Sequence, residues 1–395
     1  MEDAVLPESH ILEVLSRLPL KTIIRCKCVC KRWRDLVSDP YFVDLHLSRS
    51  RPCLSFHQYD SPSSILELVE VEHEVDYDCL TLHHVKTLNL HLSAVPYSGN
   101  WTTQVGSVNG LICLHNRDFD TTYIFNPLDE EYMILPQPPK PNLEDVRFPL
   151  TYGFGVSMTG KYKVIWIYAL KIEVYTLGTN QWRCLGPTPY RISYRWAVDP
   201  PGVFVNSHVY WIIHGQIYKF DMDTETFESF PSPPGELGDD QESMQILGVL
   251  KGSLSLFSWT SSGYNVWVMK ESWYKSIAVI QENIDPFLKS LEWEPRFLMD
   301  GSDGTSILIF WPWPEENPSL VGYCLNTNKI LDLNLPGDIF ASMLTYRPSL
   351  VKLQNFGSER VRVGSLYSNV TVSAKSRYKS SLKFEQSKGR HSSCC

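Results

Sequence analysis

The stretch IFNPLDEEYMILP, residues Ile124–Pro136, joins two apolar runs through a polar turn, and the same pattern returns four times farther along the chain. The copies begin at Val174, Lys219, Val266 and Gly322, so they follow one another at intervals of about 45 to 56 residues. Two apolar runs joined by a short polar turn are typical of a β-hairpin. A hairpin that recurs at this interval indicates a repeat architecture.

Each of the five stretches holds one apolar residue before the turn and a second one after it, seven positions later in four stretches and six positions later in the stretch from Val266. In chain order the pairs are Phe125 and Tyr132, Tyr175 and Trp182, Phe220 and Phe227, Trp267 and Trp273, and Tyr323 and Ile330. The regular spacing predicts the same short-loop hairpin in every copy.

A second hairpin precedes each copy. Its turn residues are Gly110, Gly160, Ser207, Gly252 and Gly304, each placed between two apolar strands. Two hairpins per repeat make a four-stranded antiparallel unit, which is the signature of a β-propeller blade. The alternative is a set of unrelated hairpins in a large β-sandwich.

Two further segments lack a clean copy of the repeat. Residues 51–100 could form a degenerate sixth blade, and the C-terminal SMLTYRPSLVKL, residues 342–353, could pair with N-terminal strands to close the ring. Near the ends of the second strands stand Trp166, Trp211, Trp259 and Trp311. We interpret these tryptophans as packing between blades, with a ring that stacks on a ligand as the alternative.

The charge of the 395-residue chain is uneven. The net charge is −8, although residues 357–395 hold eight Lys or Arg and two Asp or Glu, so the body is strongly acidic. An acidic body argues against nucleic acid as a partner, and the basic, Ser-rich tail from residue 357 is expected to be disordered. We expect no membrane partner and, with ten irregularly spaced cysteines and no secretory signal, a reducing location in the cytoplasm and/or nucleus.

The first residues predict helices instead of strands. LPESHILEVLSRLPLKTIIRCKCVCKRW, residues Leu6–Trp33, begins three short amphipathic helices, and SDP at Ser38–Pro40 ends the third. Such short helices carry more apolar surface than they can bury by themselves, so they dock on a partner or pack on the rest of the chain. Cys26, Cys28 and Cys30 have the wrong spacing for zinc and are expected to be small buried thiols.

The motifs LP at Leu6-Pro7, ILEVLSRLPLK and RCKCVCKRWRDLVSDPYF resemble the F-box along nearly its whole length. In F-box proteins this motif binds the Skp adaptor, and through it cullin, in cullin–Skp–F-box (SCF) ubiquitin ligases. The resemblance implies that the following residues lie at or support the adaptor interface: Leu6, Pro7, Ile11, Leu15, Leu18, Pro19 and Trp33.

The segments SVNGLICL, YIFNPLDEEY, YGFGVSMTGKYKVIWI, GVFVNSHVYWI and TYRPSLVKL are similar, in this order, to the plant F-box-associated domain. The expected fold is therefore α+β multidomain: a three-helix F-box followed by an all-β, six-bladed, kelch-like propeller. The expected bounds are 1–47 for the F-box, 48–100 for a connecting segment or degenerate blade, 101–356 for the propeller and 357–395 for the tail.

No catalytic constellation is recognisable, so we expect no catalytic residue, no metal and no cofactor. GFGVSMTG at 153–160 has the wrong spacing for a phosphate loop, and a Ser nucleophile elbow and a RING-like Cys/His array are missing from the sequence. The resemblance implies a non-catalytic substrate-recognition subunit that presents a protein target for ubiquitination and degradation. Alternatives are a propeller enzyme or small-ligand binder, and an F-box scaffold outside degradation.

Strand alternation predicts where a target would bind. Within a four-stranded blade the short turns lie on one face and the long connections lie on the other, and long loops on a rigid scaffold carry recognition. The connection after the second blade-forming repeat and the loop from Trp311 concentrate Arg and aromatic residues, the types that dominate binding hot spots. The candidate target-binding residues are Arg191, Tyr194, Arg195, Trp196 and Trp313. Ordinary solvated loops remain the alternative.

Overall fold

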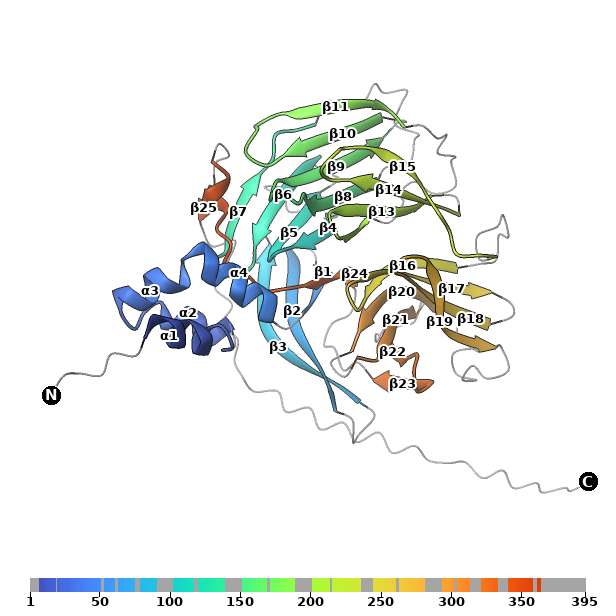
Figure 1. Ribbon diagram of the computed structural model, residues 1–395, viewed down its shortest axis with the longest axis horizontal. Coiled ribbons are helices and arrows are strands. Elements are labelled where there is room, and N and C mark those ends of the chain that lie inside the picture. The colour runs from blue at the N-terminus through green and yellow to red at the C-terminus, as the bar shows by residue number, and fades with distance from the viewer. Residues whose placement is uncertain are drawn as a thin grey trace, which may run out of the picture.

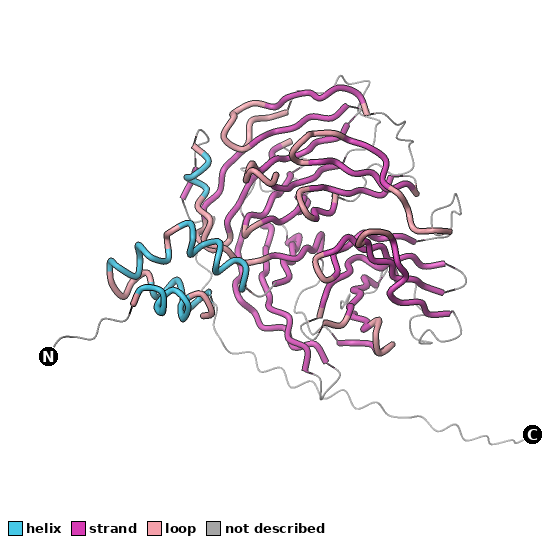
Figure 2. Tube along the Cα trace, viewed as in Figure 1, coloured by secondary structure: helices cyan, strands magenta, loops and turns pink. Residues whose placement is uncertain are grey.

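The structure is a computed structural model. It describes residues 7–18, 20–50, 53–60, 63–74, 79–90, 102–116, 120–138, 151–168, 171–188, 201–213, 215–235, 244–260, 263–280, 293–301, 304–312, 321–332, 340–357 and 361–363. Figure 1 shows a small group of helices beside a large β domain, and Figure 2 shows that strands dominate the remainder.

Four helices form the N-terminal unit: α1 (Glu8–Leu15), α2 (Leu20–Cys26), α3 (Lys31–Val37) and α4 (Pro40–Arg49). The sequence predicts three helices, and the fourth is a difference. The sequence SDP ends α3 as expected, but it also begins α4, because Asp39 accepts a hydrogen bond from the Tyr41 N–H at 2.8 Å and Pro40 occupies the first helical position. None of the described helices is long and apolar enough to span a membrane.

Six antiparallel sheets form the β domain. Blade 1 consists of β1 (Cys53–Asp60), β2 (Ser63–Glu74), β3 (Cys79–Leu90) and the distant β24 (Phe340–Tyr346). Blade 2 consists of β4 (Thr102–Val108), β5 (Leu111–Asn116), β6 (Thr121–Asn126), β7 (Glu131–Ile134) and β25 (Val361–Val363). Blade 3 consists of β8 (Thr151–Val156), β9 (Tyr162–Tyr168), β10 (Lys171–Thr176) and β11 (Trp182–Pro187).

The remaining blades follow the chain in order. Blade 4 consists of β12 (Val203–Val205), β13 (His208–Ile213), β14 (Gln216–Asp221) and β15 (Phe227–Phe230). Blade 5 consists of β16 (Met244–Leu250), β17 (Ser253–Thr260), β18 (Gly263–Met269) and β19 (Trp273–Ile280). Blade 6 consists of β20 (Trp293–Asp300), β21 (Ser306–Pro312), β22 (Val321–Cys324) and β23 (Lys329–Asp332).

The inner strands β4, β8, β12, β16, β20 and β24 contact one another in sequence around a closed ring. The ring closes where β24 pairs antiparallel with β1, with Cys53 opposite Tyr346 and Phe56 opposite Met343. Blade 1 thus joins strands from the two ends of the β domain. The structure confirms the six-bladed propeller predicted from the sequence.

The turns predicted between the first and second strands are present in blades 2, 4 and 5. Asn109–Gly110, Asn206–Ser207 and Lys251–Gly252 each place two consecutive residues at positive φ. This is the backbone of a type I′ turn, whose twist matches the twist of the flanking strands.

The turn between the third and fourth strands pairs the repeat residues across the hairpin in four blades. Phe125 faces Tyr132, Tyr175 faces Trp182, Phe220 faces Phe227, and Tyr323 faces Ile330. Blade 5 departs from this pattern. A bulge after Val266 places Trp267 opposite Lys275, and Trp273 faces Met269 instead.

Tryptophans at the ends of second strands pack between blades. Trp211 is 2% exposed and donates a hydrogen bond from its ring N–H to the carbonyl of Tyr152 in blade 3 at 3.1 Å. A Cβ atom on Gly202 would lie 2.4 Å from this ring, so the glycine permits the contact. Trp166 is buried in the apolar cluster that joins blades 2 and 3, and within its own strand it stacks on Tyr168, with ring centroids 4.0 Å apart. The blade-packing interpretation holds for both residues, while the side chain of Trp311 lies outside the described residues.

Residues 53–90 form three strands of blade 1, the blade alternative that the sequence left open for this segment. One boundary differs from that predicted. The tail predicted to be disordered from residue 357 contains β25, which pairs with β7 at the outer edge of blade 2, so the ordered domain extends at least to Val363. The pairing of β24 with β1 agrees with the expectation that the segment from residue 342 could pair with N-terminal strands to close the ring. The strand β25 leaves no clear local signal, because it pairs with a strand far away in sequence.

Candidate functional site

The helical unit has one compact core. Pro7 precedes α1 and its carbonyl accepts hydrogen bonds from the His10 and Ile11 N–H groups. At the start of α3 the Cys30 sulfur accepts a hydrogen bond from the Trp33 N–H at 3.4 Å. The core residues of the unit are Leu15, Ile23, Cys26, Leu36, Val37, Phe42 and Val43.

The residues that the F-box resemblance singled out occupy different layers of this unit. Leu15 is 2% exposed and belongs to the core, while Ile11, Leu18 and Trp33 are partly buried against the core. Pro7 is exposed. Leu6 and the side chain of Pro19 lie outside the described residues.

The thiols Cys26, Cys28 and Cys30 do not share one environment. Cys26 is buried, and burial raises the pKa of its thiol. Cys28 and Cys30 are exposed, so the expectation of three buried thiols is wrong for these two. Within the described residues no group of His, Cys, Asp or Glu could hold a metal ion.

The helices leave apolar side chains in solvent. Val14 is 61% exposed, Val29 is 64% exposed and Tyr41 is 65% exposed. These are three of the five large apolar side chains that are exposed in the described part of the chain. These three side chains are the candidate contacts of the helical unit with a partner protein.

A groove of about 680 Å³ lies between α1, α3 and the start of α4. Leu12 and Leu36 give it an apolar floor, and Lys31, Arg32 and Asp35 place charges along it. Tyr41 also lines this groove. The sequence reading missed Tyr41 because it did not recognise that a helix starts at Asp39-Pro40.

The helical unit also packs on the propeller, through the chain that follows β24. Leu350 is 3% exposed and belongs to the core of the helical unit, with Val351 packed beside it. Lys27, just beyond α2, forms an ion pair with Asp129 in the turn between β6 and β7 at 3.5 Å. The helices therefore both pack on the rest of the chain and keep an exposed apolar surface.

Residues 347–357, which we call the strap, run along blades 2 and 3 and fix this junction. The Asn126 amide donates a hydrogen bond to the Val351 carbonyl at 2.6 Å. The Glu131 carboxylate accepts hydrogen bonds from the Leu353 N–H at 3.2 Å and from the Gln354 amide at 3.1 Å.

The junction lies on the side of the ring that carries the tight turns. Asn126, Asp129 and Glu131 belong to the turn between β6 and β7 and its flanking strand ends, and Gly110 in the turn between β4 and β5 touches the strap. A Cβ atom on Gly110 would lie 2.3 Å from the Ser349 side chain, and its φ of 81° also favours glycine. We call this side the tight-turn face and the opposite side the long-connection face.

The candidate target-binding residues, Arg191, Tyr194, Arg195, Trp196 and Trp313, all lie outside the described residues. The structure describes the strand ends on either side of them: Pro187 in β11 and Val203 in β12 for the first four, and Pro312 in β21 and Val321 in β22 for Trp313.

Comparisons with known proteins agree with this architecture. Residues 5–45 match the family described as F-box domain, and residues 65–335 match the family described as F-box associated beta propeller domain. The second match covers more than half of the chain.

Similar proteins come from Arabidopsis thaliana. F-box protein At3g07870 is 26% identical over 71% of this chain and 75% of its own length. F-box protein CPR1 is 27% identical over 84% of this chain and 85% of its own length. F-box/kelch-repeat protein At3g23880 is 27% identical over 69% of this chain and 79% of its own length. The chain belongs to the family of F-box proteins that carry an F-box associated beta propeller domain.

Proposed function

We propose that this protein is the substrate-recognition subunit of an SCF ubiquitin ligase. In this proposal the helical unit binds a Skp-type adaptor, and through it cullin, while the propeller holds a protein target for ubiquitination and proteasomal degradation. An F-box joined to a β-propeller fits this role, and F-box proteins of this type are generally non-catalytic adaptors.

The observation that carries the proposal is the exposed apolar surface of the helical unit. Its core is already closed, because Leu350 of the strap completes it, and yet Val14, Val29 and Tyr41 remain in solvent. These side chains are therefore not needed to hold the unit together. A protein adaptor that covers them would gain the free energy of removing apolar area from water.

The rigid junction supports the second half of the role. Proximity accelerates transfer only when the target is held in a defined position relative to the reactive group. Leu350, the Lys27–Asp129 ion pair and the strap hydrogen bonds join the helices to the propeller as one body. A target on the propeller would then keep a fixed position relative to the adaptor.

Adaptor binding can be tested with two matched tyrosines. Full-length chain is co-expressed with a plant Skp adaptor and purified as wild type, Tyr41→Asp and Tyr274→Asp. Tyr274 in β19 is 41% exposed and contacts Lys270, so its substitution tests a comparable change on the propeller. We expect Tyr41→Asp to lose the adaptor and Tyr274→Asp to keep it, because only the first introduces an unpaired charge into the interface. Equal recovery of adaptor with both variants would refute the proposed interface.

We propose the long-connection face as a site of target contact, since the helical unit occupies part of the tight-turn face. Alanine at Arg191, Tyr194, Arg195 and Trp196 together, or at Trp313, should weaken target capture without changing the melting temperature. Targets are first trapped by affinity capture with the Tyr41→Asp variant and identified by mass spectrometry. The quadruple variant should then lengthen the half-life of a trapped target in cells, and an unchanged half-life would exclude this face.

Free thiols at all cysteines whose side chains are described fit action in the cytoplasm and/or nucleus.

A further inference from the structure

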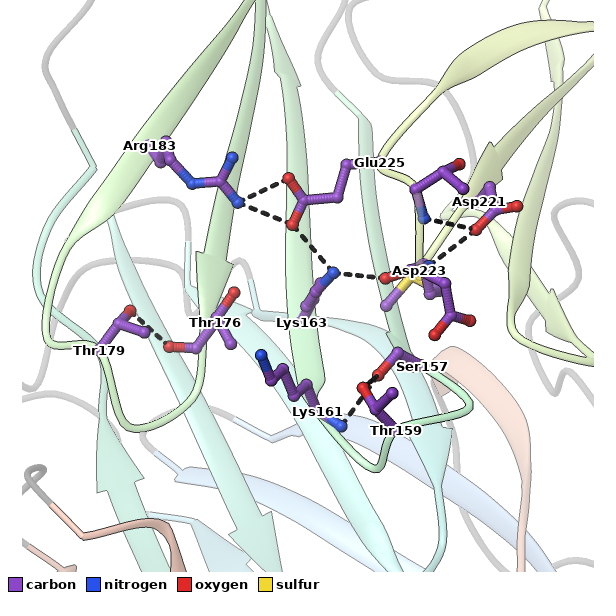
Figure 3. A network of polar contacts seen from close by, with 12 residues as sticks. Ser157, Thr159, Lys161, Lys163, Thr176, Thr179, Arg183, Asp221, Asp223 and Glu225 are labelled. Carbon is purple, nitrogen blue, oxygen red and sulfur yellow. Dashed lines mark hydrogen bonds and ion pairs between the residues drawn. The ribbon is translucent and has the colours of Figure 1, made fainter.

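A polar pocket of about 610 Å³ opens on the tight-turn face between blades 3 and 4. Its walls are the two tight turns of blade 3, around Thr159 and Thr179, and the turn of blade 4 that carries Asp223 and Glu225. Figure 3 shows the charged and hydroxyl side chains of these turns converging on one space.

One part of this network has a structural role. Lys163 is 5% exposed, and its ammonium group hydrogen-bonds the Met222 carbonyl and pairs with Glu225 at 2.9 Å. Arg183 donates to both oxygens of the same carboxylate, at 2.7 and 2.6 Å. Burial raises the pKa of Glu225, but the hydrogen bonds from Arg183 and Lys163 outweigh this effect and lower it overall. These contacts bind blade 3 to blade 4, and Glu225 is fully engaged by two cations.

Asp223 also has a structural partner. Its two carboxylate oxygens accept the Met158 N–H at 3.1 and 3.0 Å, so it holds the turn of blade 3 against blade 4. With three cations and two carboxylates lining it, the pocket carries a surplus of one positive charge in a strongly acidic body.

Lys161 has no part in that structural network. Its backbone N–H donates to the Ser157 hydroxyl at 3.0 Å, but among the described residues its ammonium group forms no ion pair. Figure 3 shows this ammonium group without a contact, below Lys163 and near Thr176. Ser157, Thr159 and Thr179 also line the pocket. The Thr179 hydroxyl donates to the Thr176 carbonyl at 2.7 Å, and Ser157 and Thr159 share one hydrogen bond at 2.9 Å, so one O–H of the Ser157–Thr159 pair is left for a ligand. A free cation beside a hydroxyl donor is chemistry that receives phosphate or carboxylate oxygens.

Met158 stands at the tip of the turn that holds this site. Its side chain is 86% exposed, the largest exposure among the large apolar side chains of the described residues. The Asp223 contact fixes its backbone, so the side chain is held in solvent beside the pocket. An exposed methionine is an adaptable apolar contact for a peptide. Packing between the blades accounts for Lys163, Arg183 and Glu225, but it accounts for neither Lys161 nor Met158.

We propose that this pocket binds an anionic side chain, phosphorylated or carboxylate, in a segment of the protein target. Lys161 and the exposed side of Arg183 receive the anion together with one hydroxyl of the Ser157–Thr159 pair, and Met158 contacts the neighbouring part of the peptide. The inference rests on the proposed function, since it names the chemistry of the target. It adds a recognition site on the same face as the helical unit, separate from the long-connection face.

The test measures peptide binding to the full-length chain. Three fluorescent libraries of nine-residue peptides carry a fixed phosphoserine, glutamate or serine at the centre, and affinity is read by fluorescence anisotropy. The basic tail attracts any anion, so each library is compared between wild type and Lys161→Gln. Lys171→Gln, an exposed lysine at the start of β10 on the other side of the same blade, is the matched control.

We expect the phosphoserine or glutamate library to bind wild type about tenfold more tightly than the serine library, because a charge-assisted hydrogen bond carries that difference. Lys161→Gln should abolish the preference, Met158→Ser should weaken all binding severalfold, and Lys171→Gln should change neither. The stronger of the two anionic libraries tells phosphate from carboxylate. Equal binding of all three libraries to wild type, or a preference that survives in Lys161→Gln, would overturn the proposal.

Adaptor binding is measured on the same preparations. The peptide assay contains no adaptor, so the two proposals can fail separately. A chain that binds anionic peptides but no Skp adaptor would refute the proposed function and support the pocket proposal. A chain that binds the adaptor and shows no anion preference would support the proposed function and refute the pocket proposal.

Discussion

The side-chain amide of Asn126 donates a 2.6 Å hydrogen bond to the backbone carbonyl of Val351, 225 residues later in the chain. This bond holds the strap against blade 2 immediately beside Leu350, the residue that enters the core of the helical unit. The F-box core of this chain is therefore completed by residues from the C-terminal end of the propeller, and the two units are less separable than their order along the chain implies.

We expect Leu350→Ala to loosen the helical unit selectively. Deleting most of a buried leucine side chain costs about 2–5 kcal/mol, and here the cavity would open between the helices and the strap. Hydrogen exchange should become faster in α1 to α4 and stay slow in the inner strands of the blades. Leu353→Ala is the matched control, since Leu353 is equally buried but packs between blades 2 and 3. Unchanged exchange in the helices would show that the strap does not support them.

Leu15 and Val14 are neighbours in α1, and an aspartate at either position should abolish adaptor binding for a different reason. Leu15→Asp places a charge in the core, where Leu15 is 2% exposed, and should unfold the helical unit itself. Val14→Asp changes a side chain that is 61% exposed, so it should keep the fold and lose only adaptor binding. Circular dichroism of the helical signal together with adaptor pull-down separates the two outcomes. If Val14→Asp retained the adaptor at wild-type affinity, this side of α1 would lie outside the interface.

The blades could be predicted from the sequence because their turns are chemically distinctive. Asn109–Gly110 and Lys251–Gly252 need positive φ, and turn residues of this kind recur at similar intervals along the chain. Blade 5 shows the limit of this reasoning. Its Trp267 and Trp273 are six positions apart instead of seven, but this spacing alone does not reveal the bulge after Val266 that places Trp267 opposite Lys275.

What the sequence could not provide is contact between residues from different repeats. Leu350 lies in an apolar run that reads like the end of a strand, and nothing local indicates that it enters a helical core. The pocket joins Lys161 and Arg183 of blade 3 to Glu225 of blade 4, and only the closed ring brings these turns together. Ile11, Leu18 and Trp33, which the F-box resemblance assigns to the adaptor interface, pack against the core of the helical unit, and their contact with an adaptor stays a prediction.

Stability should fall in mild acid because of a buried histidine. Burial lowers the pKa of His57 in β1 from its ordinary 6.5 to about 4. Between these two values the unfolded chain binds a proton that the folded chain does not, so this contribution is complete above about pH 6.5 and is lost as the pH falls toward 4. The unfolding free energy should lose up to about 1.4 kcal/mol per pH unit from this residue.

Urea unfolding at several pH values measures this slope. His57→Gln, which cannot titrate, should show a shallower dependence between pH 6.5 and 4 than the wild type. If His57→Gln and wild type lost stability in parallel, His57 would not be the group that titrates.

The ring-closing strand β24 carries a buried hydroxyl group without a hydrogen-bond partner in the described part of the chain, so we expect its removal to stabilise the protein. The side chain of Tyr346 in β24 is fully buried, and its hydroxyl group has no hydrogen-bond partner among the described residues. Burial accordingly raises its pKa well above the ordinary value.

Tyr346→Phe removes the buried hydroxyl and should stabilise the protein by about 1 kcal/mol in urea unfolding, because an unsatisfied buried polar group is costly. Tyr264→Phe is the matched control: Tyr264 is 1% exposed, and its hydroxyl donates to Asn328 at 3.0 Å, so this variant should lose about 1 kcal/mol. Tyr346→Ala should cost about 3–5 kcal/mol, since it empties the contact between β24 and blade 2 that closes the ring. Destabilisation by Tyr346→Phe as large as that of Tyr264→Phe would mean that the Tyr346 hydroxyl is satisfied and that β24 closes the ring without this cost.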